Sequence, residues 1–298
     1  VRGFARPDLF TVVHEQFLTD TTDYADMVLP ATTFFEQRDL QTGYGHYYVQ
    51  LSEAAITPIG EARSNFDVFA ALAARMGFPE DCFRESVDTA IDAALDSGHE
   101  WVKGIDRAKL EREGHVRLNL PRSSDSTFFL PFAAGGFPTP SGKAELYSEA
   151  MAAKGLDPVA QFVPPAESRH APEARRFPLE LLARKADNFL NSTFTNLPSV
   201  QVLEQRGLLE INHTDAQARG IRDGDAVRIF NGRGELHLTA RVNGAVRPGV
   251  VAGRLDWAKL SAEGKNVNVL ISDRKSDLGG GAVFYSALVE VERAEMVR

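Results

Sequence analysis

Cysteine is almost missing from this chain, and its scarcity excludes several kinds of site. Cys82 is the only cysteine among the 298 residues. Because an iron–sulfur cluster, a thiolate zinc site and a disulfide framework all need several cysteines, this chain cannot assemble any of them alone. The seven histidines are found in neither HxH nor HxxxH spacing. We therefore predict no metal-ligating residue.

The chain also lacks an excess of positive charge and a long apolar run. Its formal net charge is −8 and its isoelectric point is near 5.5. A nucleic-acid partner requires a basic surface that neutralises phosphates, so we predict that there is none. No apolar run approaches the roughly 18 residues of a membrane span, and no cationic segment leads into an apolar one at the start. We predict no membrane-spanning helix.

Length and proline spacing together predict two domains. At roughly 150 residues per domain, the chain is long enough for two. Prolines recur from residue 158 to residue 178, where they disfavour both helix and central strand. We predict a partial α/β domain over residues 1–156, a linker over 157–177 and a β domain over 178–298. The chain opens on Val1 and soon enters a strand-like run, which favours a piece of a longer protein.

The first domain mixes strands and helices, which indicates α/β architecture. Residues 9–13 and 27–29 are short β-type runs. Ser64 to Asp67 form a capping-box pattern, apolar residues follow at helical spacing, and Gly77 supplies the stop. A second helix is predicted from Ser86 to Gly98 on the same grounds.

The last domain has a β pattern with one short helix. Asn231-Gly232 lies between two runs with period-two alternation, which predicts a hairpin of strands 226–230 and 235–242. Thr214 and Gly220 are expected to cap a short helix, and His213 is interpreted as part of its entry. Several strands with few helices predict a small closed barrel.

A polar loop follows the first strand-like run of this domain, after residue 182. It combines two cations, Arg184 and Lys185, with amides, a hydroxyl and bulky apolar groups. Fixed cations suit the anionic oxygens of a pyrophosphate, although the same pair could simply be solvated on a barrel rim. The candidate contacts are Ala183, Arg184, Lys185, Asn188, Phe189, Leu190, Asn191 and Ser192.

Several short motifs occur in an order that resembles one family. Asp26 to Pro30 reads DMVLP with Glu36 beyond it, Gly60 to Arg63 reads GEAR, and Thr139 to Leu146 reads TPSGKAEL. After the polar loop come the segments at 210–215, 220–227 and 266–270. In this order they resemble the C-terminal part of the molybdopterin oxidoreductases, the dimethyl sulfoxide reductase family, including its dinucleotide-binding domain.

The resemblance implies a fold and a cofactor. The fold is an α/β remnant followed by a six-stranded double-psi β-barrel, and the cofactor is bis-molybdopterin guanine dinucleotide with molybdenum. Asn65 stands where many members have an aspartate, and Gln37 replaces a lysine of some relatives, so these two contacts are neutral here. Trp257 and Tyr285 either face the ligand or fill core and strand positions. Besides the loop residues, the implied contacts are His14, Glu15, Gln37, Asn65, Trp257, Asn268 and Tyr285.

The resemblance also implies a function. The expected protein is a molybdenum-dependent oxidoreductase of anaerobic respiration, whose metal ligand and any 4Fe-4S cluster belong to upstream segments. This chain would then hold cofactor, contain no catalytic residue and be inactive alone. Its expected partners are the upstream domains of the same polypeptide and an electron-transfer subunit, in the cytoplasm. Two alternatives stay open: a structural subunit without molybdenum, of the respiratory NADH dehydrogenase type, and a stand-alone barrel binding module.

Overall fold

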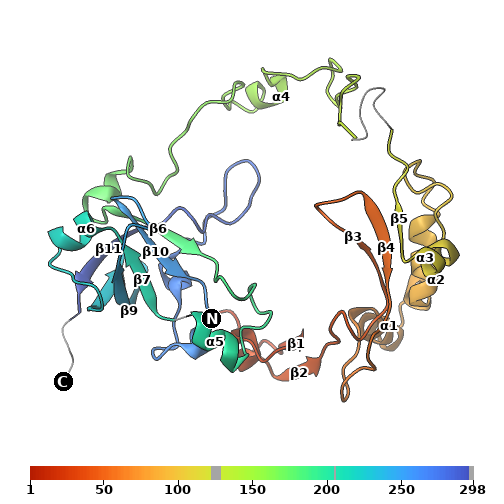
Figure 1. Ribbon diagram of the computed structural model, residues 1–298, viewed down its shortest axis with the longest axis horizontal. Coiled ribbons are helices and arrows are strands. Elements are labelled where there is room, and N and C mark those ends of the chain that lie inside the picture. The colour runs from red at the N-terminus through yellow and green to blue at the C-terminus, as the bar shows by residue number, and fades with distance from the viewer. Residues whose placement is uncertain (122–128, 205, 295–298) are drawn as a thin grey trace. The chain divides into compact units, whose positions relative to one another are not determined.

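A computed structural model describes residues 1–121, 129–204 and 206–294 of the chain. The chain divides into two compact units (Figure 1). Unit 1 comprises Val1–Leu18 and Tyr24–Ala160, and unit 2 comprises Thr19–Asp23 and Gln161–Arg298. The domain boundaries predicted at residues 156 and 178 stay a prediction.

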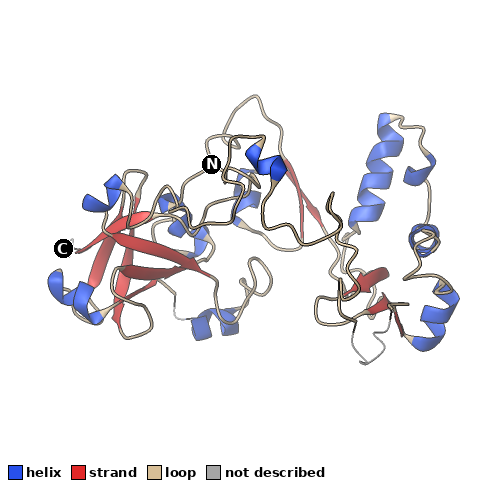
Figure 2. Ribbon diagram, turned by 90° about the horizontal axis from the view of Figure 1, so that it is seen from above, coloured by secondary structure: helices blue, strands red, loops and turns tan. Residues whose placement is uncertain are grey.

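Unit 1 combines two small sheets with short helices (Figure 2). One sheet pairs β1 and β2 in parallel, and the other has the antiparallel order β3-β4-β5. The first strand begins at Val12, later than predicted, because the Thr11 amide donates to the Asp26 carboxylate at 2.7 Å. The elements are β1 Val12–Glu15, β2 Met27–Pro30, β3 Asp39–Thr42, β4 Tyr48–Ser52, α1 Asn65–Met76, η2 Asp81–Phe83, α2 Val87–Leu95, α3 Arg107–Glu113, β5 His115–Arg117 and α4 Glu149–Ala152.

Three of the four predicted helix caps of unit 1 are confirmed, and the predicted stop at Gly98 is wrong. The Ser64 hydroxyl accepts from the Asp67 amide at 3.0 Å, and Gly77 ends α1 with φ 77°. That backbone conformation favours glycine, which explains the stop signal. Ser86 caps α2 by accepting from the Thr89 amide at 3.1 Å, but the helix ends at Leu95, earlier than Gly98.

The core of unit 1 is small, and much of its apolar surface is exposed. On α1 the side chain of Ala73 is buried, whereas Phe69 is 60% exposed and Met76 is 62% exposed. The apolar face that the sequence predicts for this helix is therefore only partly covered. The buried cluster consists of Val49, Ile91, Leu95, Ile105, Leu110 and Val116.

Two arginines connect the helices and sheet of unit 1. Arg38 lies 2.6 Å from Glu53 and 2.9 Å from Asp88, and Arg107 lies 2.8 Å from Asp92. The Arg107 guanidinium holds the pKa of the Asp92 carboxyl below its usual range. These contacts stabilise the ionised carboxylates and fasten α2 and α3 to the strands.

Unit 2 is built around a closed six-stranded barrel, as predicted. Its strand order is β10-β6-β11-β8-β9-β7. Strand β6 runs parallel to β10 and β7 runs parallel to β9, and the other neighbouring strands are antiparallel. Closure leaves the sheet without a free edge. The elements are η3 Pro172–Arg175, β6 Leu179–Arg184, α5 Pro198–Glu204, β7 Leu208–Ile211, α6 His213–Ala218, β8 Ala226–Phe230, β9 Glu235–Val242, β10 Val250–Arg254, η4 Ala258–Leu260, η5 Val267–Leu270 and β11 Leu288–Arg293.

The hairpin prediction is confirmed, and one cap prediction is wrong. Strands β8 and β9 pair on either side of Asn231-Gly232. Helix α6 is capped by Asn212, whose side chain accepts from the Thr214 amide at 3.0 Å, so Thr214 lies inside the helix. Asparagine is among the best N-cap residues and stands two positions earlier, which explains the shift. His213 is the first residue of the helix, as expected.

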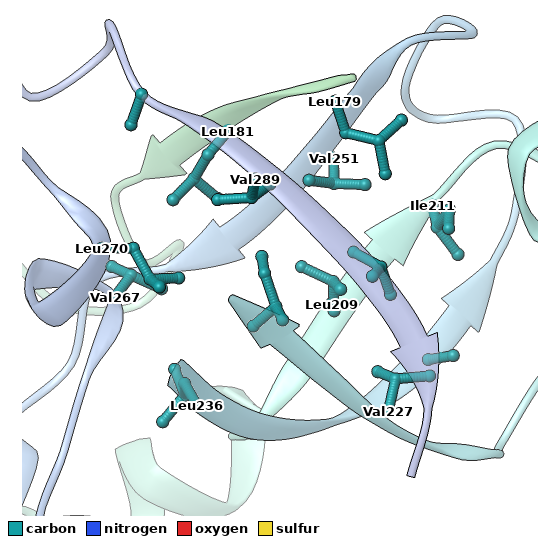
Figure 3. Close-up of a cluster of buried hydrophobic side chains, with 14 of the residues drawn as sticks. Leu179, Leu181, Leu209, Ile211, Val227, Leu236, Val251, Val267, Leu270 and Val289 are labelled. Carbon is teal, nitrogen blue, oxygen red and sulfur yellow. The ribbon is translucent and has the colours of Figure 1, made fainter. Parts of the chain in front are cut away.

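The barrel encloses one apolar core (Figure 3). Alternate residues of β6, Leu179, Leu181 and Ala183, are buried, as a half-buried strand requires. Gly253 lies so close to this core that an added Cβ would come within 2.8 Å of Val267. A side chain at Gly253 would therefore push η5 away from the barrel wall.

A short segment from the first part of the chain belongs to unit 2. The Asp20 carboxylate accepts from the amides of Ala258 and Lys259 at 2.7 and 2.9 Å. Asp23 pairs with Lys259 at 2.8 Å. Asp20 therefore caps η4 from outside and orders the loop that carries Trp257.

Candidate cofactor-binding site

The polar loop begins where two parallel strands of unit 2 end. Strand β6 ends at Arg184 and β10 ends at Arg254, and these two residues are partners in the parallel register. Parallel strands place the loops that follow them at the same end of the sheet. The loop after residue 184 and the loop after residue 254 therefore leave the barrel side by side.

A chain of ion pairs joins the two strand ends. The Arg184 guanidinium donates to both oxygens of Asp187 at 2.7 and 2.6 Å. Arg254 reaches the same carboxylate at 3.0 Å and pairs with Glu204 at 2.5 Å. Asp187 thus bridges two guanidiniums, and we call Arg184 and Arg254 the guanidinium pair.

Glu204 holds the loop from inside. Its side chain is only 2% exposed and accepts from the backbone amide and, at 3.0 Å, the side-chain amide of Asn188. A buried carboxylate requires this kind of compensation by a cation and hydrogen bonds. The amide of Asn188, a predicted ligand contact, is thereby engaged in fixing the loop.

A cavity of about 430 Å³ is lined by Arg254 of the guanidinium pair. Two predicted contacts, Phe189 and Trp257, line it together with Arg206 and Asp256. Arg206 lies 2.9 Å from Asp256, and its Nη2 is buried without a hydrogen-bond partner among the described residues. Burial raises the pKa of Asp256 above its ordinary value. The cavity thus combines aromatic surface with a buried donor.

The remaining loop residues differ in their surroundings. Ala183 is buried in the barrel core, because it occupies an inward position of β6, so its side chain faces away from the loop. Lys185 and Leu190 are exposed, and Ser192 is half-buried. Asn191 has φ 55°, a conformation that asparagine tolerates, and its carbonyl accepts from Thr195 at 2.6 Å.

Two predicted contacts lie apart from the Trp257 cavity. Asn268 is exposed on η5, and its amide donates to Asn266 at 3.0 Å. Tyr285 is 51% exposed and lines a different hollow of about 350 Å³, together with Arg169 and Glu180. Neither residue is core, and the structure does not bring Tyr285 into one cavity with Trp257.

Gln37 and Asn65, two of the four predicted contacts in unit 1, line one hollow of about 650 Å³. Asn65 is the first residue of α1, whose amino-terminal amides offer donors for an anion. Gln37 accepts from Thr32 at 2.8 Å. At the rim the buried Glu36 accepts from the amides of Thr33 and Ile59, which lowers its carboxyl pKa.

His14 and Glu15 lie at the carboxyl end of the parallel strand β1. His14 Nε2 is 3.2 Å from the carbonyl oxygen of Arg63, and Nδ1 is buried without a hydrogen-bond partner among the described residues. Glu15 accepts from the Gln16 amide at 2.8 Å. The carboxyl ends of parallel strands are common ligand sites in α/β proteins.

These residues fit a polar, anionic ligand. The cations Arg184, Lys185 and Arg254 can bind phosphate oxygens. Among the described residues, Arg206 has two buried donors without a hydrogen-bond partner, Nε and Nη2, and His14 has one such ring nitrogen, Nδ1. Sequence analysis missed Arg254, Glu204, Arg206 and Asp256. The parallel pairing of β10 with β6 places Arg254 beside Arg184, and no local sequence pattern indicates this contact.

Two absences concern the part of the chain that the structure describes. Within residues 1–121, 129–204 and 206–294, no cluster of three or more His, Cys, Asp or Glu side chains could hold a metal ion. In the same residues no helix is both long and apolar enough to cross a membrane.

Two family models match this chain. The model described as Molydopterin dinucleotide binding domain matches residues 179–288, and the one described as Molybdopterin oxidoreductase matches residues 1–75. They agree with the cofactor that the sequence motifs imply, a bis-molybdopterin guanine dinucleotide with molybdenum.

Curated relatives extend along the whole chain. The probable oxidoreductase YoaE of Bacillus subtilis (strain 168) is 41% identical over 294 residues, which are 98% of this chain and 41% of the relative. Dimethyl sulfoxide reductase DmsA of Escherichia coli (strain K12) is 33% identical, over 95% of this chain and 37% of its own length. This chain spans about two fifths of the length of these relatives.

A solved structure has the same fold. Acetylene hydratase from Pelobacter acetylenicus superposes with a TM-score of 0.75 and 22% identity, over 96% of this chain and 40% of that one. At this identity the likeness shows the fold alone, and it agrees with an α/β part followed by the barrel.

Proposed function

We propose that this chain is the C-terminal part of a molybdenum-dependent catalytic subunit. The premise is that the chain belongs to the molybdopterin oxidoreductase family of the dimethyl sulfoxide reductase type. In this proposal it binds bis-molybdopterin guanine dinucleotide through loops of both units. The observation that carries the proposal is the guanidinium pair beside the Phe189 and Trp257 cavity.

The cofactor would supply the redox chemistry, and the residues of this chain would bind and orient it. Arg184, Lys185 and Arg254 are suited to phosphate oxygens, because guanidinium and ammonium groups donate charge-assisted hydrogen bonds to them. The amides of Asn191 and Asn268 and the hydroxyl of Ser192 suit the heteroatom edge of a pterin. In unit 1, His14, Glu15, Gln37 and Asn65 would contact a nucleotide.

The proposed partners are the upstream domains of the same polypeptide and an electron-transfer subunit, in the cytoplasm. Exposed large apolar side chains support an intramolecular partner, because contact with another domain would remove them from water. In unit 1 these include Phe10, Phe34, Phe35, Ile59 and Phe69. The metal ligand and any iron–sulfur cluster would belong to the upstream part, and this chain alone would be inactive.

The test is molybdenum occupancy in the longer protein that contains this chain. Arg184→Ala with Lys185→Ala should lower the molybdenum bound per polypeptide by about tenfold, because two charge-assisted contacts are lost. The matched control is Arg222→Ala with Arg247→Ala. Both control residues are exposed, and Arg247 precedes β10 at the strand end opposite Arg254. Metal is quantified by mass spectrometry after gel filtration.

Two outcomes would count against the proposal. Equal molybdenum content in the control and in the loop variant, Arg184→Ala with Lys185→Ala, would show that these loop residues do not bind the cofactor. A longer wild-type protein that carries no molybdenum when expressed with a complete cofactor supply would favour a structural subunit of the same fold.

A further inference from the structure

The turn η4 begins with a residue that cannot cap it. Trp257 stands at its N-cap, and among the described residues its side chain makes no capping hydrogen bond. Helical turns usually begin with serine, threonine, aspartate or asparagine, whose side-chain oxygen accepts from the first free amides. An indole has a donor and no such acceptor. The amides of Ala258 and Lys259 therefore need an acceptor from elsewhere in the chain.

Asp20 supplies that acceptor from a distant part of the sequence. Its Oδ2 accepts from the Ala258 amide at 2.7 Å and its Oδ1 accepts from the Lys259 amide at 2.9 Å, so both carboxylate oxygens are used. Asp20 is half-buried and begins the short turn η1, Asp20–Tyr24. Hydrogen bonds to an ionised acceptor are stronger than neutral ones, and here they hold the main chain directly after Trp257.

The second acidic residue of this segment binds the loop in a different way. Asp23 pairs with the Lys259 ammonium at 2.8 Å, and its side chain is 53% exposed. An ion pair with this exposure contributes little, and it joins two side chains without fixing the main chain of η4. Asp20 and Asp23 thus have the same charge in the same turn, but only the Asp20 carboxylate accepts from the η4 amides.

The chain before Trp257 is held independently by the barrel. The Asp256 carboxylate lies 2.9 Å from Arg206 and accepts from the Trp257 amide at 2.8 Å. Burial raises the pKa of Asp256, and the negative charges of Glu204 and Asp20 raise it further, which places Asp20 in the electrostatic surroundings of this carboxyl. The main chain at Trp257 is therefore fastened on one side by Asp256 and on the other side by Asp20.

We propose that Asp20 is a positioning residue, which holds Trp257 in the wall of the 430 Å³ cavity by capping η4. The inference rests on the proposed function for the identity of the ligand and adds Asp20 to it. Phe189 lines the same cavity, so the two side chains offer aromatic surface to a flat ring. An indole that is fixed in advance loses less conformational entropy when the ligand binds.

The first experiment measures how freely a quencher reaches Trp257 in the 298-residue chain. Trp101→Phe leaves Trp257 as the only tryptophan, and acrylamide quenching of its emission reports its accessibility. In this background Asp20→Ala should raise the Stern–Volmer constant by about twofold, because the η4 amides lose both acceptors and the loop opens locally. Asp20→Asn keeps one acceptor oxygen, so its constant should lie between those of the parent and Asp20→Ala.

Asp23→Ala is the matched control, because it removes the same charge from the same turn and leaves the η4 amides capped. Its Stern–Volmer constant should stay within about a fifth of the parent value. Circular dichroism confirms that each variant is folded. If Asp20→Ala does not fold, Asp20→Asn is compared with Asp23→Asn and should give the higher constant. An unchanged constant in the Asp20 variant, or an equal rise in its Asp23 counterpart, would overturn the inference.

A second measurement asks whether Asp20 acts through Trp257. In the longer protein that contains this chain, Asp20→Ala and Trp257→Ala should each lower the bound guanine nucleotide by about threefold. The double variant should lose no more than Trp257→Ala alone, because the two residues form one unit, and losses that multiply would contradict the inference. A longer protein that carries no nucleotide would contradict the proposed function and leave the quenching result standing, so the two claims fail separately.

Discussion

Unit 2 buries its apolar residues in a closed barrel, whereas unit 1 leaves many of its own at the surface. Among the described residues, the barrel core contains seventeen buried side chains and the core of unit 1 contains six. The parallel pair β1 and β2 has open edges, and parallel sheets are normally covered on both faces. The difference shows that unit 2 has the larger core to support its loops, whereas many large apolar side chains of unit 1 are exposed.

The largest expected effect concerns the barrel core. Leu209→Ala should lower the free energy of unfolding of unit 2 by about 3 kcal/mol, because Leu209 is fully buried and its removal leaves a cavity. The same change at Leu72, which is 49% exposed on α1, should cost less than about 1 kcal/mol in unit 1.

Fluorescence can measure the two units separately. Trp101 lies in unit 1 and Trp257 in unit 2, so a Trp101→Phe background reports unit 2 and a Trp257→Phe background reports unit 1. Denaturant titration of each background gives the two free energies. Equal costs for Leu209→Ala and Leu72→Ala would contradict the comparison.

A smaller effect is expected at the carboxylates that bind arginine. Glu204→Gln should destabilise unit 2 by about 2 kcal/mol, because it leaves the Arg254 charge without its buried partner. Glu53→Gln removes an exposed partner of Arg38 and should cost at most about 1 kcal/mol. The same titrations measure both changes, and a larger loss for Glu53→Gln would reverse the ranking of the units.

The smallest effect concerns pH. Arg107 lowers the pKa of Asp92 in unit 1, and Arg169 lowers the pKa of Glu180 in unit 2. A carboxyl with a depressed folded pKa stabilises the fold above its unfolded pKa, near 4, and loses this contribution as pH falls through the folded pKa. Asp92→Asn and Glu180→Gln should each make stability less dependent on pH below about 4. Thermal unfolding from pH 7 to pH 3 tests this, and an unchanged acid slope would contradict it.

Local patterns predicted several elements of each unit, but not β3, β4, β5, α3 or α4. Ser64 and Gly77 bound α1, and Asn231-Gly232 marks the hairpin, because these signals act over a few residues. The α6 cap was misplaced because Asn212 and Thr214 are both good cap residues and only the fold selects between them.

The ligand site could be predicted only in part. The family motifs indicated the loop with Arg184, but Arg254 joins it through parallel pairing with a strand about seventy residues earlier. Asp20 reaches η4 from still farther along the chain. Such contacts follow from barrel closure, which no local pattern encodes.

The most direct test of the account is the cofactor content of the longer protein that contains this chain. Acid release and chromatography give its guanine nucleotide, and mass spectrometry gives its molybdenum. The account predicts both, with twice as much guanine nucleotide as molybdenum, and a parallel loss of both in Arg184→Ala with Lys185→Ala. A folded longer protein that carries neither, or that keeps both in this variant, would contradict it.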